Sequence, residues 1–226
     1  MNLTYYGQSC FLVNINGANL LFDPFITPNE LAAHININEI PADYILLSHG
    51  HSDHVADVEA IAKRTGATII AAFEVATWFE KQGCTKYHPM NTGGKWKFDF
   101  GTVKCVNAIH SSSMPDGSYG GNPMGFVVTT DDGNFYYSGD TALTLDMQLI
   151  PSFASLNLCI LPIGDNFTMG CEDAAEAARM VQCKKVVGVH YDTFGYIKID
   201  KRKAVDSFRM KDLQLLLPAI GETISI

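Results

Sequence analysis

The segment His49-Gly50-His51-Ser52-Asp53-His54 places three imidazoles and one carboxylate within six residues. It directly follows residues 42–48, a short apolar run typical of a strand buried on both faces. Because side chains alternate along a strand, the first two histidines can point the same way, and the aspartate and last histidine would reach the same space from the turn that follows. Imidazole and carboxylate are natural ligands of divalent transition metals, and the absence of cysteine from the segment disfavours a closed structural zinc site. The segment therefore predicts a metal centre at the end of a buried strand.

Strands and helices alternate on both sides of this segment. Apolar alternation, the Asn16-Gly17 turn signal and the helical spacing of apolar residues define the elements. We expect strands at residues 3–6, 10–15, 19–22, 42–48, 68–71, 96–100, 103–109, 124–130, 134–138, 157–161, 185–189, 213–217 and 222–226. We expect helices near residues 55–62, 74–81, 143–150, 172–182 and 201–210. This order indicates sheets covered by helices on their outer faces. Since no linker or repeat divides the chain, we predict a single domain over residues 1–226.

The charge of the chain narrows the classes of partner. The 226 residues include 16 Lys and Arg against 24 Asp and Glu, which gives a formal charge of −8. Binding of nucleic-acid backbones depends on Lys and Arg neutralising phosphates, so this charge argues against a nucleic-acid partner. Apolar residues make up 47% and charged residues 18%, the composition of an ordinary globular protein. We expect a small-molecule substrate, and the sequence leaves a homo-oligomer open.

Cysteine usage and hydropathy bear on the compartment. The six cysteines form no CxxC pair, as expected for free thiols in a reducing cytoplasm. The first residues lack the basic and apolar regions of a secretion signal, and no apolar run approaches the roughly 20 residues of a membrane span. We therefore expect a cytoplasmic protein with no membrane partner.

The chain resembles a known superfamily. The His-x-His-x-Asp-His pattern at residues 49–54 is similar to the signature of the metallo-β-lactamase superfamily, and His110, Asp140 and His190 stand after later strands in the order that superfamily shows. Further stretches resemble one branch, the uncharacterised metal-dependent hydrolases related to L-ascorbate-6-phosphate lactonase; these stretches are residues 88–94, 110–113, 164–170 and 190–194. The branch usually shows Gly-His-Ser near the N-terminus, and Gln8 departs from it.

The resemblance implies a fold and a ligand set. The fold is of the α/β (α+β) class, a four-layer αβ/βα sandwich with a metal site at the edge between its two sheets. One ion would be held by His49, His51 and His110, and a second by Asp53, His54 and His190, with Asp140 bridging. The cofactor would be one or two divalent transition-metal ions, with zinc favoured and manganese, iron, nickel or cobalt as alternatives.

The resemblance also implies a reaction. A divalent ion lowers the pKa of bound water from 15.7 to about 7 and so supplies hydroxide at neutral pH. We expect a metal-dependent hydrolase acting on an ester, lactone or phosphoester of a small molecule, with Asp53 as the catalytic residue that orients the hydroxide. An RNA or DNA phosphodiesterase would use the same ligands and is the alternative, which the negative charge disfavours. Di-iron redox chemistry and a binding module with a vestigial site are weaker alternatives.

Five further residues have two interpretations each. Asp23, before Pro24, either fixes a metal-bound imidazole or makes an Asp-Pro turn. Asp165 and Asn166 either line the substrate pocket or form the turn that begins a helix. Ser111 either hydrogen-bonds substrate or shapes the turn after His110. His88 is expected in a Gly-rich loop, where solvent exposure is commoner than catalysis.

Overall fold

The Asn16-Gly17 turn opens the first sheet. In the computed structural model, which describes residues 1–226, both turn residues have positive φ (49° and 75°), as a tight hairpin requires. The hairpin joins β2 (Cys10–Ile15) to β3 (Ala18–Phe22), and β1 (Asn2–Gly7) pairs antiparallel with β2. The parallel strands β4 (Tyr44–Leu46), β5 (Thr68–Ala72) and β6 (Tyr87–Met90) continue the sheet beyond β3.

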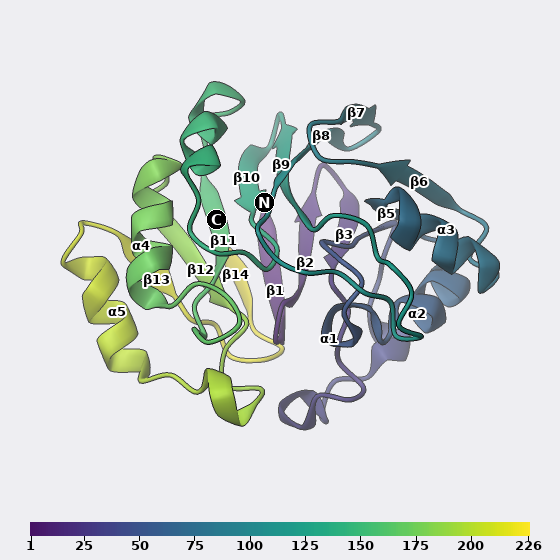
Figure 1. Ribbon diagram of the computed structural model, residues 1–226, viewed down its shortest axis with the longest axis horizontal. Helices are drawn as coiled ribbons and strands as arrows, with labels where there is room; N and C mark the ends of the chain where they lie inside the picture. The colour runs from purple at the N-terminus through teal and green to yellow at the C-terminus, as the bar shows by residue number, and fades with distance from the viewer.

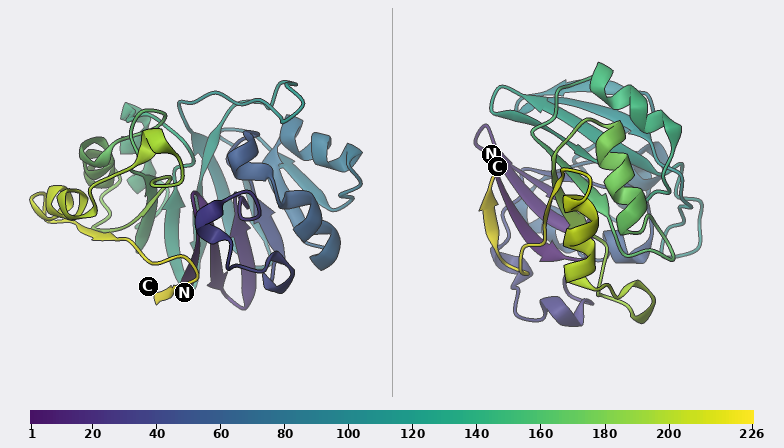
Figure 2. Two further views of the ribbon diagram at one scale, coloured as in Figure 1. Left: turned by 90° about the horizontal axis from the view of Figure 1, so that it is seen from below. Right: turned by 90° about the vertical axis from the view of Figure 1, so that its left-hand side faces the viewer.

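The second sheet repeats this plan. Four antiparallel strands come first: β7 (Lys95–Phe98), β8 (Gly101–Asn107), β9 (Met124–Thr130) and β10 (Gly133–Tyr137). Three parallel strands follow: β11 (Leu158–Pro162), β12 (Lys185–Val189) and β13 (Gln214–Leu216). The chain then returns to the first sheet, where β14 (Thr223–Ser225) pairs with β1, so the two termini lie side by side (Figure 2). Each sheet has seven strands.

Helices cover the outer face of each sheet (Figure 1). The first sheet carries α1 (Ser52–Val55), α2 (Val58–Thr65) and α3 (Phe73–Lys81). The second carries α4 (Cys171–Met180), α5 (Lys201–Arg209) and the 3₁₀ helix η3 (Leu145–Ser152). Three short 3₁₀ helices lie in loops: η1 (Glu30–Ala32), η2 (Ile37–Glu39) and η4 (Gly195–Ile197). Local signals set their ends: α2 ends at Gly66 with φ 72°, and the Asp200 side chain caps the first turn of α5.

Aromatic rings fill the space between the sheets. Phe11 and Phe22 of the first sheet stack with ring centroids 4.6 Å apart. Rings of the second sheet meet them edge-on: Tyr137 lies 5.0 Å from Phe11 and 5.6 Å from Phe22, and Phe135 lies 5.8 Å from Phe22. Offset and edge-on pairs add about 0.5–1.5 kcal/mol each beyond area burial. This packing joins the two sheets into the predicted αβ/βα sandwich, and the fold class is confirmed.

Four local expectations differ from the structure. The strand expected at residues 42–48 is only Tyr44–Leu46, because the chain turns toward the metal-ligand segment after Leu47. The expected helix at 55–62 is split into α1 and α2. The helix near 143–150 is the 3₁₀ helix η3, which contains Pro151, a residue without the N–H of a regular helix. His88 lies in strand β6, not in a loop, with its ring against Trp96 and Phe98.

None of the helices combines the length and the hydrophobicity that a membrane span requires.

Candidate metal centre

The first sheet supplies its polar cluster through one tight turn. His49 and His51 follow β4, and Asp53 and His54 lie in α1. Gly50 allows the turn, since a Cβ there would lie 2.5 Å from Met114 Sδ and 3.0 Å from the Ser113 carbonyl oxygen. A side chain at this position would displace the loop that covers the turn. Glycine is therefore required for the segment to pass beneath that loop.

The second sheet supplies single residues at three strand ends. His110 follows β8, Asp140 follows β10 and His190 follows β12. His190 has φ 55° and Gly139 has φ 62°, so the chain makes left-handed turns at two of these ends. A Cβ at Gly139 would lie 2.8 Å from Cβ of Ser48, which shows how closely the two sheets approach beside the cluster. Left-handed backbone costs of order 1–3 kcal/mol for a side-chain-bearing residue and concentrates at functional sites.

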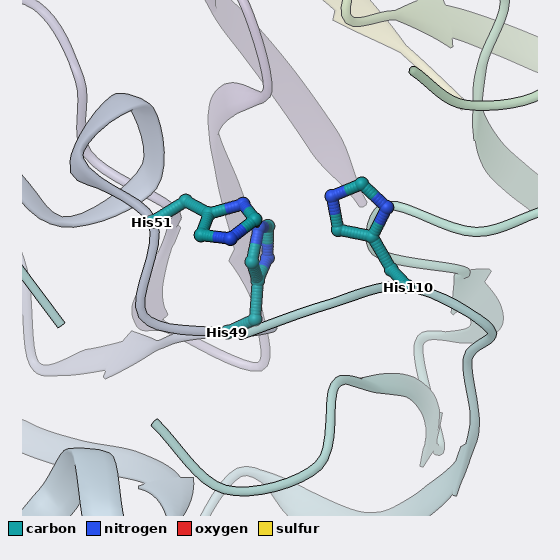
Figure 3. A group of neighbouring side chains, drawn as sticks. All are labelled: His49, His51 and His110. Carbon is teal, nitrogen blue, oxygen red and sulfur yellow. The ribbon is translucent and has the colours of Figure 1, made fainter. Parts of the chain in front are cut away.

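His49, His51 and His110 form what we call the three-histidine group. Their imidazoles point toward a common space (Figure 3), with ring centroids 4.5 to 5.2 Å apart. His49 Nε2 lies 2.9 Å from His51 Nδ1. One potential ligand nitrogen from each residue lies within 4.8 Å of the others, which suits three ligands of one ion.

Asp53, His54 and His190 form the mixed group, whose ligand atoms also lie within 4.8 Å of one another. Asp53 Oδ2 lies 3.5 Å from His54 Nε2 and 3.6 Å from His190 Nε2. Asp140 lies between the two groups, with Oδ2 at 3.2 Å from His54 Nε2, 3.0 Å from His190 Nε2 and 3.8 Å from His110 Nε2. The structure therefore brings all seven expected ligand residues together.

Buried atoms without hydrogen-bond partners fit a cation at this cluster. His54 Nε2 and Asp140 Oδ1 are buried and make no hydrogen bond. A buried unpaired nitrogen or carboxylate oxygen is costly unless another group satisfies it. Lone pairs of imidazole and carboxylate converge here, so a divalent ion bound at this cluster would supply the missing partner for these atoms. The donor set has nitrogen and oxygen only, which suits zinc, manganese, iron, cobalt and nickel.

Asp23 is a buried hub beside the cluster. Its Oδ2 accepts hydrogen bonds from Ser48 Oγ at 2.6 Å and from the Tyr137 hydroxyl at 2.6 Å, and lies 2.9 Å from His54 Nδ1. Its Oδ1 accepts from the Ser48 amide at 2.8 Å. A carboxylate at Nδ1 fixes the tautomer and orientation of the ring and leaves Nε2 for a metal. Asp23 thus lies where a residue that orients the His54 imidazole toward a metal would have to lie.

The environment separates the histidines into two electrostatic classes. Burial, together with neighbouring imidazoles, holds the pKa of His49 well below its ordinary value. Burial also lowers the pKa of His51 and of His110. The three-histidine group is therefore neutral at physiological pH and has lone pairs available.

The mixed group has the opposite balance. Burial alone would lower the pKa of His54 and His190, but the nearby carboxylates outweigh it: the pKa of His54 lies well above its ordinary value, and that of His190 is raised to about 9. Burial alone would likewise raise the pKa of Asp53 and Asp140, but the facing imidazoles hold both pKa values below the usual range. This half of the cluster is a network of charged pairs whose protons a metal would displace.

A cavity of about 1020 Å³ opens over the cluster, and His51, Asp53, His110, Asp140 and His190 line it. Ser111 also lines the cavity, with Oγ 3.4 Å from His51 Nε2. Asp165 and Asn166 lie in the loop between β11 and α4, outside the lining of this cavity, whereas the next residue, Phe167, lines it. Of the three residues that the sequence offers as substrate contacts, Ser111 lines the cavity, whereas Asp165 and Asn166 do not.

Relatives of this chain share its length and fold. A model of the Beta-lactamase superfamily domain matches residues 18–191. The UPF0173 metal-dependent hydrolase of Christiangramia forsetii is 53% identical over 227 residues, which cover 100% of both chains. The chain belongs to the UPF0173 metal-dependent hydrolases of the β-lactamase superfamily.

Two solved structures extend this comparison. Igni18, a metallo hydrolase from Ignicoccus hospitalis, is 30% identical with a TM-score of 0.89, covering 99% of this chain and 97% of its own. An isothiocyanate hydrolase from Delia radicum gut bacteria is 20% identical with a TM-score of 0.80, covering 100% of this chain and 99% of its own, and shows the shared fold.

Three side chains of this metal-dependent hydrolase contact the cluster or Asp23 beside it and were not among the predicted site residues. Ser48 and Tyr137 both donate to Asp23. Gln8 donates from Nε2 to Asp53 Oδ2 at 2.9 Å. Ser48 adjoins the ligand segment and could have been suspected for that reason. The sequence shows that Gln8 stands where the resembling branch usually has His. It could not show that Gln8 contacts Asp53, because 45 residues separate the two.

Proposed function

We propose that this metal-dependent hydrolase cleaves an ester, lactone or phosphoester bond of a small molecule, using one or two divalent ions with zinc favoured. The observation that carries the proposal is the set of seven convergent side chains, five of which line one open cavity. A divalent ion bound there would acidify a coordinated water and polarise the bond to be cleaved. The coordinating residues would be His49, His51 and His110 for one ion and Asp53, His54 and His190 for another, with Asp140 shared.

Asp53 is the residue we assign to catalysis. Its side chain is 23% exposed and lines the cavity, whereas Asp140 is 2% exposed. Its Oδ2 is held by Gln8, and its Oδ1 makes no hydrogen bond. Oδ1 is therefore free to orient the attacking water, and this orienting role is the one we assign to Asp53. The Ser111 hydroxyl, which lines the same cavity, would hydrogen-bond the polar part of the substrate.

The charges around the cavity favour a small substrate over a nucleic acid. Lys198 is the one lysine or arginine in the lining. A phosphate backbone would need a row of such cations. All six cysteines are free thiols, which suits the reducing cytoplasm we propose as the location.

Metal analysis coupled to turnover tests the proposal. Protein purified without chelators should contain one or two ions per chain, and Asp53→Ala should lose metal together with about 100-fold or more of the turnover. Asp99→Ala, on an exposed turn, is the matched control and should change neither. If Asp53→Ala keeps its metal and its turnover, the role of Asp53 is wrong. If loaded wild-type protein cleaves no ester, lactone or phosphoester in a broad panel, the reaction class is wrong.

A further inference from the structure

Four large apolar side chains stand at the mouth of the metal cavity: Leu31, Phe167, Phe194 and Tyr196. They are between 38% and 79% exposed, and all four line the same cavity as the metal cluster. We call them the apolar rim. Exposed apolar groups gathered at a concave site mark binding surfaces, because water leaves such a surface at little cost.

The rim is assembled from three separate segments, which argues against a chance patch. Leu31 comes from η1, Phe167 from the loop between β11 and α4, and the other two from the loop after His190. The Phe167 and Tyr196 rings meet edge-on, with centroids 6.1 Å apart. Phe194 is 6.2 Å from the buried ring of Phe25, which anchors it.

The backbone before Phe167 is shaped to present its ring. Asp165 and Asn166 both have left-handed φ, 64° and 54°. The Asn166 amide donates to Asp165 Oδ1 at 2.8 Å, and the Phe167 amide donates to the Asp165 carbonyl oxygen at 2.6 Å. Two consecutive left-handed residues make a tight turn at a cost in backbone energy. The two residues therefore serve the cavity indirectly, by holding Phe167 at its edge.

The charges of the lining leave the mouth without a net preference for ions. Asp53 and Asp140 belong to the cluster, and Asp192 pairs with Lys201 at 3.3 Å. The remaining charges are Glu30 and Lys198, of opposite sign and without an ion-pair partner. A neutral apolar group suits this mouth better than a polyanion does.

We propose that the apolar rim binds the hydrophobic group, aryl or medium-chain alkyl, of an ester or lactone substrate whose scissile bond reaches the metal cluster. This inference rests on the proposed function for the reaction and on the rim alone for the binding. Contact made equally in the ground and transition states lowers KM and leaves kcat unchanged. The rim should therefore act on KM.

Two measurements on the protein as purified test the rim. The variant is Phe167→Ser with Tyr196→Ser, and the control is Leu145→Ser with Leu149→Ser, comparably exposed side chains on η3 outside this cavity. The first measurement is binding of the neutral fluorescent probe N-phenyl-1-naphthylamine. The rim variant should bind the probe at least about 5-fold more weakly, and the control should bind it like the wild type.

The second measurement is hydrolysis of p-nitrophenyl acetate and p-nitrophenyl octanoate. The rim variant should raise KM for the octanoate about 10-fold with kcat retained, and should raise KM for the acetate by no more than about 3-fold, because both esters carry the same aryl group and only the octanoate adds an alkyl chain. Equal behaviour of rim and control variants in probe binding would overturn the proposal. So would a change of oligomeric state in the rim variant on sedimentation, which would make the rim an interface between copies. If neither ester is cleaved by any of the proteins, the ester form of the proposed function fails, while probe binding still decides the rim.

A second inference concerns Gln8 and rests on different contacts. Gln8 is buried in the turn between β1 and β2 and has φ 51°. Its Nε2 donates to Asp53 of the first sheet, and its backbone carbonyl accepts from the His190 amide at 2.8 Å and from the Tyr5 hydroxyl at 3.1 Å. The residue thus contacts cluster residues supplied by both sheets.

The geometry points to Gln8 as a positioning residue for the Asp53 carboxylate. A flipped amide would bring the Gln8 oxygen against a carboxylate oxygen, so only one orientation of the amide suits the contact. This hydrogen bond restrains rotation of the carboxylate and keeps Oδ2 on the side of His54 and His190, which lie 3.5 and 3.6 Å from it. The backbone contact to His190 keeps the opposite wall of the mixed group in register with it.

Matched substitutions separate positioning from folding. Gln8→Met keeps the size of the side chain and still places a residue with a Cβ at φ 51°, but it removes the Nε2 donor. Gln8→His supplies an N–H donor again. In Gln8→Met one of the two equivalents of cobalt(II), the one assigned to the mixed group, should bind about 10–100-fold more weakly, its visible absorption should change, and kcat should fall. Gln8→His should restore binding to within about 3-fold. Wild-type cobalt binding and spectrum in Gln8→Met, or equal weakening of both equivalents in both variants, would overturn the inference.

Discussion

The two sheets share one plan, antiparallel strands followed by parallel strands, yet they supply the metal cluster in different ways. The first sheet gives four residues from one turn after β4. The second gives one residue from each of three strand ends, His110, Asp140 and His190. The first contribution is local in sequence, and its geometry follows from a single turn. The second exists only when a whole sheet has formed in register.

This difference predicts which substitutions disturb the metal cluster most. A change in the local turn alters one segment, whereas a change at a strand end of the second sheet alters how the sheets meet. Asp140 is the extreme case, because it lies within 3.8 Å of histidines from both sheets. The predictions below test this comparison from the largest expected effect to the smallest.

Asp140→Ala should have the largest effect. It removes the carboxylate that faces His54, His110 and His190 and leaves those imidazoles without their shared anion. Metal content, measured by elemental analysis, should fall below one ion per chain, and hydrolysis should fall on the order of 1000-fold. Asp131→Ala, in the exposed turn between β9 and β10, is the control and should match the wild type. Retention of two ions by Asp140→Ala would mean that the halves of the cluster are independent.

Asp23→Asn tests the contact between the first sheet and Tyr137 of the second. An amide cannot accept from Ser48, Tyr137 and His54 as the carboxylate does, so the His54 ring loses its orientation. Metal affinity should fall about 10–100-fold.

The control for Asp23→Asn is Asp57→Asn. Asp57 is another buried aspartate of the first half of the chain, and it accepts from the Ile26 and Thr27 amides instead of from a ligand residue. That variant should lower the free energy of unfolding by about 1–3 kcal/mol without changing metal affinity. Equal metal affinities in the two variants would rule out a special role for Asp23.

Gly139→Ala tests how tightly the sheets approach. The new Cβ would lie 2.8 Å from Ser48 Cβ and 2.9 Å from the Met124 carbonyl oxygen, at a φ that disfavours alanine. We expect a loss of about 2–4 kcal/mol in the free energy of unfolding, measured by urea denaturation. Gly17→Ala has a similar φ, 75°, with nothing within 4 Å, and should cost only about 1 kcal/mol. Equal losses of unfolding free energy in Gly139→Ala and Gly17→Ala would show that the close approach of the sheets at Gly139 does not add to the cost of the substitution.

The smallest effect is a pH dependence of the chelator-treated protein. The pKa of His190 is raised from 6.5 to about 9, so its stabilising contribution is complete below pH 6.5 and is lost as the pH rises through 9. The metal-free protein should therefore lose stability over this range. The metal-loaded protein should not, because the ion takes the place of the proton. Denaturant midpoints at pH 6.5 and 9 measure the slope, and a slope of the same size with metal bound would contradict the assignment.

The sequence predicted the elements and the ligands with different success for physical reasons. Strands such as residues 10–15 and 185–189 and the turn at Asn16-Gly17 were predicted because their signals are local. The seven converging residues were found through their order after strands, together with the resemblance. The ligand roles, the ion and the single domain stay predictions.

The contacts that could not be predicted from the sequence join residues far apart in the chain. Tyr137 reaches Asp23 across 114 residues, and Gln8 reaches Asp53 across 45, so neither contact has a periodic signature. The apolar rim escaped for the same reason, since its side chains come from three loops. The strand at His88 was missed because Pro89 and the following glycines resemble a loop, whereas an edge position in the sheet tolerates proline.

The pairing of β14 with β1 in the first sheet affects how readily the protein associates with other molecules. Strand β1 would otherwise present a row of unpaired N–H and C=O groups to solvent, and such an edge recruits strands from other molecules. Three residues, Thr223–Ser225, cover that edge and are too short to offer an extended edge of their own. Deletion of β14 would therefore expose the edge of β1 and lower the solubility of the protein.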